Sequence, residues 1–197
     1  MFISFEGLDG CGKTTQARLL ADALEDEGQS VVRVREPGGT ATGERVRELL
    51  LDADASIGAA AEALLYAAAR AQLVDEVIRP ALARGETVVA DRFIDSSLAY
   101  QGVARKLGVD EVLLVNRFAT DGLMPNLTLL LELPQDEAAS RRGGIPDRME
   151  AEGSGFHAEV ARGFAEAAER FPERVRTIDA SGPPREVLAR VREVVAL

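Results

Sequence analysis

The chain contains a glycine-rich segment whose residue types and spacing suit the binding of phosphate groups. Residues 7 to 14 are Gly-Leu-Asp-Gly-Cys-Gly-Lys-Thr, which fits the pattern G-x-x-x-x-G-K-[ST] directly behind an apolar run at residues 2 to 5. Glycines let the backbone turn tightly and point successive N–H groups at an anion. Lys13 can then reach the β- and γ-phosphates, and the Thr14 hydroxyl suits a magnesium ion. The predicted contacts to a nucleoside triphosphate are Gly7, Leu8, Asp9, Gly10, Cys11, Gly12, Lys13, Thr14 and Thr15.

Asp91 and Arg92 directly follow the apolar run at residues 87 to 90 and are a second candidate for binding magnesium and phosphate. Phosphate-binding-loop enzymes commonly use a carboxylate at such a place to bind or order the magnesium shell. The fork of a guanidinium suits a phosphate acceptor or a transferring phosphoryl group. Asp91 alone could simply cap the strand, but the pair favours catalysis.

Asp9 lies inside the phosphate-binding loop, where its carboxylate would be repelled by a triphosphate unless it faces another group. A sugar hydroxyl or a magnesium-bound water would suit it, and a solvent-facing turn residue is the alternative. We therefore add Asp9 to Thr14 and Asp91 as a predicted magnesium contact. Cys11, the single cysteine, excludes an internal disulfide framework and is interpreted as a small loop residue.

The order of strands and helices predicts an α/β fold with a doubly wound, five-stranded parallel sheet and helices on both faces. The expected strands are residues 2–6, 31–35, 87–91, 127–133 and 175–178, and the expected helices are residues 13–27, 41–51, 59–83, 110–121, 155–170 and 184–195. Ligands of such folds bind beyond the carboxyl ends of the strands. Gly7, Glu36 and Asp91 are expected to meet at that edge, within one domain spanning residues 1–197.

Residues 134–156 interrupt this pattern with prolines, glycines and arginines that are poor core material. A long loop within a compact domain is more often functional than idle, so we expect a mobile lid rather than a merely solvated loop. Its Arg141, Arg142 and Arg148 could close over the donor phosphates. On the expected helix at residues 59–83, Tyr66 and Arg70 are four residues apart and could stack on a base and bind a base carbonyl, although without further context burial in the core is the favoured interpretation.

Composition narrows the class of protein. The formal charge of −10 over 197 residues argues against a general nucleic-acid binder, whereas a small phosphorylated ligand can still bind where arginine, lysine and magnesium are locally concentrated. No apolar run approaches the length of a membrane span, and the first residues suit a strand rather than a signal peptide. We therefore expect a cytoplasmic enzyme that contacts neither membranes nor nucleic acid.

Taken together, these segments resemble the thymidylate kinase family of P-loop nucleoside monophosphate kinases, which pass the γ-phosphate of ATP to dTMP to give dTDP for dTTP synthesis. The resemblance covers nearly the whole chain. It is most specific in the segments from Glu6 to Gln16, from Arg35 to Thr40 (Arg-Glu-Pro-Gly-Gly-Thr) and from Asp91 to Gly102 (Asp-Arg-Phe-Ile-Asp-Ser-Ser-Leu-Ala-Tyr-Gln-Gly). Gly10 together with the lid arginines resembles the bacterial members, which carry their extra catalytic arginines in the lid.

The resemblance implies roles for individual residues. The implied catalytic residues are Lys13, Asp91, Arg92, Arg141, Arg142 and Arg148. The implied dTMP-binding residues are Asp9 at the 3′-hydroxyl, Pro37, Tyr66 stacked on thymine, Arg70 on a thymine carbonyl, Arg92 on the acceptor phosphate, Ser97, Tyr100 and Gln101. Tyr100 would exclude a ribose 2′-hydroxyl. Similar kinases form homodimers through long helices, to which residues 59–83 could contribute.

Two other functions are weighed against this one. A kinase for another nucleoside monophosphate is the main alternative, because the phosphate-binding loop specifies only a bound nucleotide. A GTP-dependent binding switch is less favoured, because the chain has no Asn-Lys-x-Asp segment and its Asn116 is followed by arginine.

Overall fold

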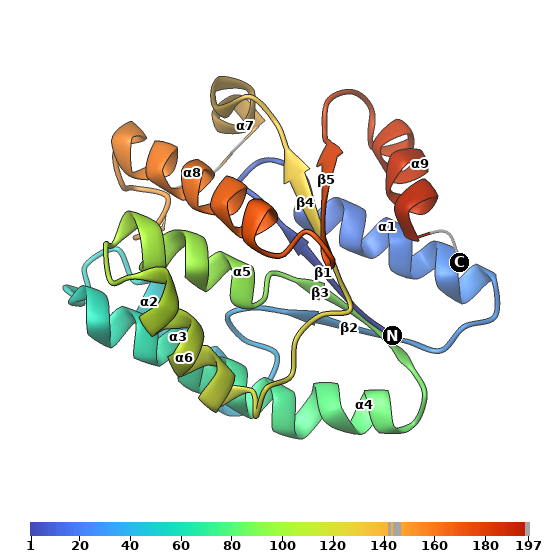
Figure 1. The fold of residues 1–197 in the computed structure, drawn as a ribbon, viewed down its shortest axis with the longest axis horizontal. Helices are drawn as coiled ribbons and strands as arrows, with labels where there is room; N and C mark the ends of the chain where they lie inside the picture. Colours follow the sequence, from blue (N-terminus) through green and yellow to red (C-terminus); the bar gives the residue numbers. More distant parts are fainter. Residues whose placement is uncertain (142, 144–146, 196–197) are drawn as a thin grey trace.

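Five parallel strands form a single sheet in the order β2-β3-β1-β4-β5 in the computed structural model, which describes residues 1–141, 143 and 147–195 (Figure 1). The strands are β1 (Phe2–Glu6), β2 (Val31–Arg35), β3 (Thr87–Asp91), β4 (Leu127–Glu132) and β5 (Val175–Asp179). The central strands are apolar on both faces because helices cover both faces. Phe5 pairs with Asp91, and Arg35 pairs with Asp91 from the other side, so the carboxyl ends of these three strands lie together, as predicted.

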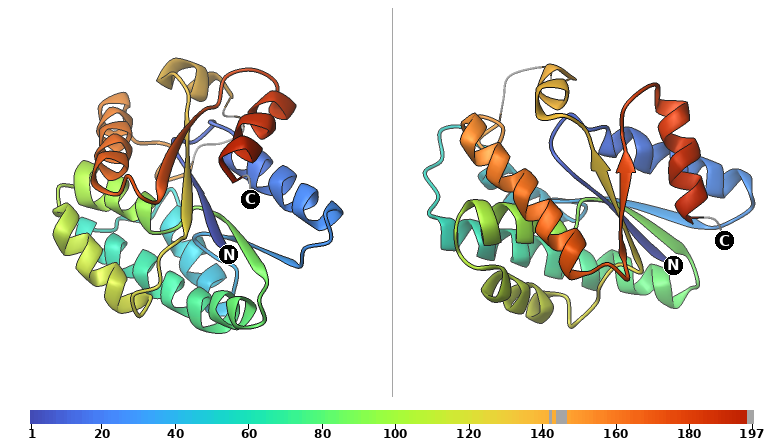
Figure 2. Two further views of the ribbon diagram at one scale, coloured as in Figure 1. Left: turned by 45° about the vertical axis from the view of Figure 1, so that its right-hand side comes forward. Right: turned by 45° about the horizontal axis from the view of Figure 1, so that its top comes forward.

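Helices cover the sheet unequally. The helical segments are α1 (Lys13–Asp26), α2 (Ala41–Leu51), α3 (Ala59–Leu73), η1 (Val74–Ile78), α4 (Arg79–Ala83), α5 (Ile94–Ser97), η2 (Leu98–Ala104), α6 (Val109–Ala119), α7 (Gln135–Arg141), α8 (Ser154–Arg170) and α9 (Pro184–Val195). Figures 1 and 2 show α1 and α9 on one face of the sheet, with α3, α4, α5, α6 and α8 on the other. None of the helices in the described ranges is long and apolar enough to cross a membrane.

The predicted strands and long helices are confirmed, with one internal change. The expected helix at residues 59–83 consists of α3, the wider π-helical turn η1, and α4. Pro80 explains the change, because it has no N–H to donate to the carbonyl four residues earlier and its ring crowds that turn. The backbone widens directly before the proline, and the helix then continues.

Two helical regions were not predicted. Residues 94–104 form α5 and η2, although Asp95, Ser96 and Ser97 are poor helix formers. Their polar side chains instead bind partners far away in the sequence, such as Arg174, whose two terminal nitrogens lie 2.6 and 2.7 Å from the Asp95 oxygens. Within residues 134–156, which were expected to be poor core material, residues 135–141 form α7 and Met149 is buried. The lid role expected for this segment stays a prediction.

Helix α8 crosses η2 at backbone distance. Gly163 makes this possible, because a Cβ atom added there would lie 2.7 Å from the Cα atom of Ala99 and 3.0 Å from the Cβ atom of Val103. Real side chains essentially never approach so closely. The crossing holds η2 against α8. Two of the predicted substrate-binding residues, Tyr100 and Gln101, lie on η2.

Candidate active site

A cavity of about 950 Å³ lies beyond the carboxyl ends of the strands. The predicted site residues that line it are Asp9, Gly10, Cys11, Gly12, Lys13, Thr14, Thr15, Pro37, Tyr66, Asp91, Arg92, Ser97, Tyr100, Gln101 and Arg141. The structure therefore brings most of the predicted triphosphate and substrate contacts into one space. Gly7, Leu8, Arg70 and Arg148 are predicted contacts that do not line this cavity.

The phosphate-binding loop has the geometry that its glycines predict. Gly7 has a φ angle of 133°, and a Cβ atom there would lie 2.5 Å from the carbonyl oxygen of Leu131, so only glycine fits. Gly12 precedes α1 in the left-handed conformation and offers no side-chain cap to the helix. The first N–H groups of α1 and the positive end of its dipole are thus available to an anion. The Lys13 ammonium donates to the Leu8 carbonyl over 2.7 Å and lies 3.6 Å from the nearer Asp9 oxygen.

Thr14 and Asp91 meet at the start of α1 and the end of β3, where the Thr14 hydroxyl donates to the Asp91 carboxylate over 2.5 Å. A hydroxyl and a carboxylate are the oxygen ligands that magnesium prefers. Within the described residues, no three histidine, cysteine, aspartate or glutamate side chains gather to form a complete metal site. These two residues fit a magnesium ion that takes its remaining ligands from phosphate oxygens and water.

Arg92 occupies an unusual backbone conformation that the surrounding residues stabilise. Its φ angle of 73° lies in the left-handed region, which non-glycine residues rarely adopt. The buried Glu6 carboxylate accepts bonds from the Phe93 N–H at 2.7 Å and the Ser96 hydroxyl at 2.6 Å. Ser96 in turn accepts a 2.9 Å bond from the Arg92 guanidinium. Glu6 begins the family-like segment from Glu6 to Gln16, but no role was predicted for it. Its pKa is raised to about 8 by burial and by the nearby Asp95 charge.

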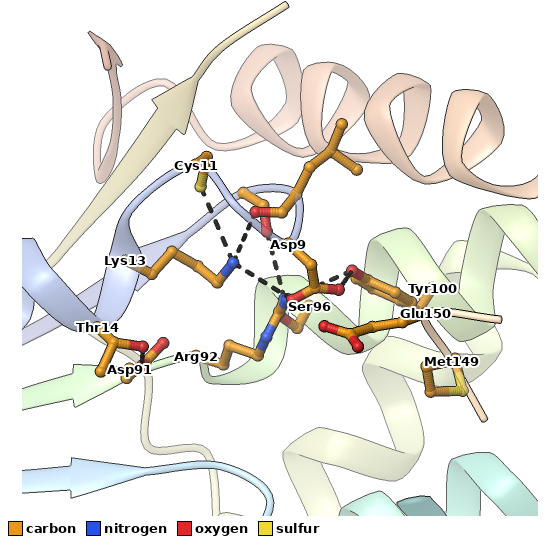
Figure 3. A network of polar contacts seen from close by, with 12 residues as sticks. Asp9, Cys11, Lys13, Thr14, Asp91, Arg92, Ser96, Tyr100, Met149 and Glu150 are labelled. Atoms are coloured by element: carbon orange, nitrogen blue, oxygen red, sulfur yellow. Dashed lines mark hydrogen bonds and ion pairs between the residues drawn. The ribbon is translucent and has the colours of Figure 1, made fainter. Parts of the chain in front are cut away.

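Asp9 pairs with two cations of the site, Lys13 and Arg92 (Figure 3). Arg92 and Lys13 both pair with its first oxygen, and the Tyr100 hydroxyl donates to the second over 3.0 Å. Burial would raise the pKa of the Asp9 carboxyl, but the charges of Arg92 and Lys13 outweigh burial and hold that pKa well below its usual range. Asp9 is therefore ionised. The sugar hydroxyl and magnesium contacts proposed for it stay predictions, because its contacts in the structure are to protein groups.

The cavity is also lined by the predicted substrate contacts Pro37, Tyr66, Ser97, Tyr100 and Gln101. In the view of Figure 3, Lys13 and Arg92 lie between the Thr14–Asp91 pair on one side and Tyr100, Met149 and Glu150 on the other. Glu36, which was expected at this edge of the sheet, also lines this space, together with Gln16, Arg35 and Ser96 from the family-like segments. Residues for which no role was predicted complete the lining, namely Arg47, Leu51, Asp147, Met149, Glu150, Ala180, Gly182, Pro184 and Val187. Arg47 could have been suspected, because it follows the Arg35 to Thr40 segment by about two helical turns. It donates to the Pro37 carbonyl over 2.9 Å.

Arg70 lies behind the cavity. Its side chain is 1% exposed, and its Nε donates to the Glu36 carboxylate at 2.8 and 3.0 Å. Its terminal nitrogens donate to Ser97 at 3.0 Å, to Asn116, to the Phe93 carbonyl and to Glu36 again. All five N–H groups of the guanidinium have partners. The predicted contact with a thymine carbonyl stays a prediction and requires one of these partners to be exchanged.

The predicted lid arginines are separated in the structure. Arg141 lies at the end of α7, lines the cavity, and contacts Glu137 at 2.6 Å and the Ala180 carbonyl at 3.5 Å. Arg148 instead donates to the Leu50 carbonyl at 2.8 Å and to Glu62 at 2.7 Å, away from the phosphate-binding loop. Arg142 lies outside the described residues. Of the two described arginines, Arg141 is the one placed to meet a donor phosphate.

A phosphate-binding loop with its lysine and a strand-end Asp-Arg pair line one cavity beyond the carboxyl ends of the parallel strands, and together they define a P-loop nucleotide kinase. Comparison with known proteins specifies the family. The family model described as thymidylate kinase matches residues 5–191. The chain therefore belongs to the thymidylate kinase family.

Individual relatives agree with this assignment. Thymidylate kinase from Caldanaerobacter subterraneus subsp. tengcongensis is 51% identical over 195 residues, which are 98% of this chain and 92% of the relative. Thymidylate kinase from Leifsonia xyli subsp. xyli is 50% identical over 196 residues, covering 98% of this chain and 92% of the relative. A crystal structure of thymidylate kinase from Ehrlichia chaffeensis superposes with a TM-score of 0.81 at 33% identity, covering 99% of this chain and 98% of the other.

Proposed function

We propose that this enzyme transfers the γ-phosphoryl group of ATP to dTMP, giving dTDP and ADP, with magnesium bound near Thr14 and Asp91. The observation that carries the proposal is the position of Asp9, which Lys13 of the phosphate-binding loop and Arg92 of the strand-end pair contact together. Two cations that contact the same carboxylate are close enough to bind the donor phosphates and the acceptor phosphate next to each other. The donor phosphates then lie at Lys13 and the acceptor phosphate at Arg92.

The mechanism requires no covalent enzyme intermediate, because in-line transfer between bound anions depends on positioning and charge stabilisation. Lys13 and the first N–H groups of α1 hold the donor phosphates, and Arg92 holds the acceptor phosphate. Arg141 adds positive charge from α7 at the donor end. A bound magnesium ion would neutralise charge on the donor phosphates. Asp9 keeps both cations in place and remains ionised while doing so.

The proposed acceptor pocket should prefer a deoxynucleotide. Tyr66, Ser97 and Gln101 line the cavity, and Tyr100 is buried beside them. In this proposal the first three contact the base and the Tyr100 ring lies against the sugar. The Tyr100 ring is packed at its edges by Phe156 and Phe164, with ring centroids 6.2 Å away in each case. Because the ring cannot move aside easily, an added ribose hydroxyl meets a fixed obstacle.

A substrate panel tests the proposal. Magnesium-dependent ADP release from ATP is measured with dTMP, dUMP, UMP, CMP, GMP and AMP supplied separately at matched concentrations. We expect dTMP to give the highest turnover. Selective turnover of another monophosphate would replace dTMP with that substrate, and the absence of ADP release with every acceptor would refute kinase activity. A guanine-dependent switch is already disfavoured, because Asn116 is buried against Arg70 and unable to bind a guanine base.

We further infer a homodimer, supported by an exposed apolar strip on α3 and α6. Leu64 on α3 is 57% exposed, and Leu114 and Phe118 on α6 are 71% and 91% exposed. The two helices pack against each other, so these side chains belong to one side of the molecule. Sedimentation of the parent and of a Leu114→Glu, Phe118→Glu variant tests the inference, with a monomeric variant expected. The predicted cytoplasmic location is consistent with the proposed substrates.

A further inference from the structure

Behind the base pocket lies a buried carboxylate, Glu62, to which the proposed mechanism assigns no role. Glu62 is on α3 and has no solvent exposure. One oxygen accepts bonds from the Gln101 side-chain nitrogen at 2.8 Å and from Arg105 at 3.3 Å. The other accepts from Arg105 at 3.1 Å and from Arg148 at 2.7 Å. These four bonds use the whole acceptor capacity of a carboxylate.

Glu62 is held in its ionised form. Burial alone would raise the pKa of its carboxyl, but the hydrogen bonds from Gln101, Arg105 and Arg148 outweigh burial and lower that pKa. An ionised carboxylate can only accept hydrogen bonds. The group that faces it from Gln101 must therefore be the amide nitrogen, because the amide oxygen would place two acceptors against each other.

This constraint fixes the polarity of Gln101 toward the cavity. With its nitrogen turned to Glu62, Gln101 has its carbonyl oxygen left for a ligand, and no described residue donates to that oxygen. Beside it, the Ser97 hydroxyl oxygen accepts from Arg70 at 3.0 Å, which leaves the hydroxyl proton free to be donated. The pocket thus presents one acceptor and one donor side by side from the same helical segment.

We propose that Glu62 is a positioning residue for base selection, which orients the Gln101 amide so that the pocket accepts a hydrogen bond from a ring N–H. Thymine and uracil have such an N–H at position 3, flanked by carbonyl groups that the Ser97 hydroxyl can bind. Cytosine has an unprotonated ring nitrogen and an amino group at the corresponding positions. Cytosine therefore meets acceptor against acceptor and leaves a buried polar group without a partner, which costs more than the loss of one bond. The proposal rests on the proposed function, because it places the base of the acceptor nucleotide in this pocket.

The nucleotides dUMP and dCMP give a matched pair of probes, because they differ only in the groups at positions 3 and 4 of the ring. Isothermal titration calorimetry measures their dissociation constants for the parent, Glu62→Gln and Gln101→Leu enzymes and for the double variant. In Glu62→Gln the new amide can face Gln101 with either its oxygen or its nitrogen, so Gln101 is free to turn over. We expect the preference for dUMP over dCMP to fall by about tenfold, the effect of about 1.4 kcal/mol.

Two further variants separate positioning from general support of the fold. Glu152→Gln removes the other carboxylate partner of Arg105, at 2.6 Å, without touching Gln101, and should keep the parent preference. Glu62→Asp keeps the negative charge beside Arg105 and Arg148, but its shorter side chain moves the carboxylate oxygen away from Gln101. It should therefore lower the preference for dUMP over dCMP, and it provides the test if Glu62→Gln does not fold. In the Gln101→Leu background, replacing Glu62 should change the preference no further.

Three outcomes would overturn the proposal. One is an unchanged ratio of the two dissociation constants in folded Glu62→Gln and Glu62→Asp, with equal weakening of both nucleotides. Another is a full effect of Glu62→Gln in the Gln101→Leu background. The third is a parent enzyme that binds dCMP as tightly as dUMP. Failure of the proposed function is seen separately, as selective binding of dUMP without any phosphoryl transfer to dUMP or dTMP.

Discussion

Replacing Arg70 by methionine tests whether this residue serves mainly the fold or mainly the substrate. In the structure, Arg70 is the counter-ion of Glu36, and both side chains are almost completely buried. Removing one partner of a buried ion pair leaves an uncompensated charge and typically costs about 3–5 kcal/mol of folding free energy. In a chain of this size each kcal/mol lowers the melting temperature by about 2–4 °C. Arg70→Met should therefore melt about 6–20 °C below the parent.

Thermal unfolding followed by circular dichroism without nucleotides measures this loss. The pH dependence adds a second readout, because burial raises the pKa of Glu36 even with Arg70 beside it. Without Arg70, burying Glu36 costs less folding free energy when its carboxyl is protonated than when it is ionised. The deficit of Arg70→Met relative to the parent should thus be smaller at pH 5 than at pH 8. The double variant with Glu36→Gln should recover part of the loss, since it removes the unpaired charge.

The control is Ser97→Ala, which removes a cavity-lining hydroxyl bonded to the same guanidinium and leaves the ion pair intact. It should weaken dTMP binding with a far smaller change in melting temperature. A melting temperature of Arg70→Met within about 3 °C of the parent, a loss of about one kcal/mol, combined with a large rise in KM for dTMP, would refute the argument. Arg70 would then be a direct base contact whose protein partners are dispensable.

Three other predictions follow from the site. Lys13→Ala should lower kcat by about 10²–10³-fold, the effect of losing one charge-stabilising donor, and near-parent turnover in steady-state assays would contradict its assignment. Arg141→Ala should lower kcat with saturating dTMP more than it raises the KM for ATP, whereas Arg148→Ala, which strips Glu62 of a partner, should mainly lower the melting temperature; equal effects on kcat would contradict the separation seen here. For Glu6, the folded-state pKa of about 8 exceeds the ordinary value of 4.5, so the native protein binds more protons than the unfolded chain between these pH values and its stability falls as pH rises through them. Glu6→Gln should abolish that share of the decline, and parallel stability curves for the two proteins from pH 5 to 8.5 would argue against it.

Much of the architecture was predictable because it depends on local pattern. The phosphate-binding loop is contiguous, and Asp91 and Arg92 directly follow an apolar strand, so their positions at the sheet edge follow from parallel strand geometry. The helix at residues 94–104 was not predictable in this way. Its Asp95 is stabilised by Arg174, 79 residues away in the chain, and no local propensity reports such a partner.

The finer chemistry of the site was less accessible for the same reason. The spacing of Tyr66 and Arg70 placed both on one helical face, but spacing does not say which of them reaches the cavity and which pairs with Glu36 behind it. Likewise, Arg141 and Arg148 appeared equivalent in sequence. Only the contacts of Arg148 with the Leu50 carbonyl and with Glu62 distinguish their surroundings.

The close crossing at Gly163 has a consequence for genetics. Any glycine codon becomes an alanine codon through one base change. The methyl group added at position 163 would overlap with Ala99 and Val103. This overlap would push α8 away from η2, although no residue that lines the cavity is replaced. Such a change would be expected to make the enzyme temperature-sensitive, with activity retained at low temperature and lost at high temperature because a helix is displaced and not because a catalytic group is damaged.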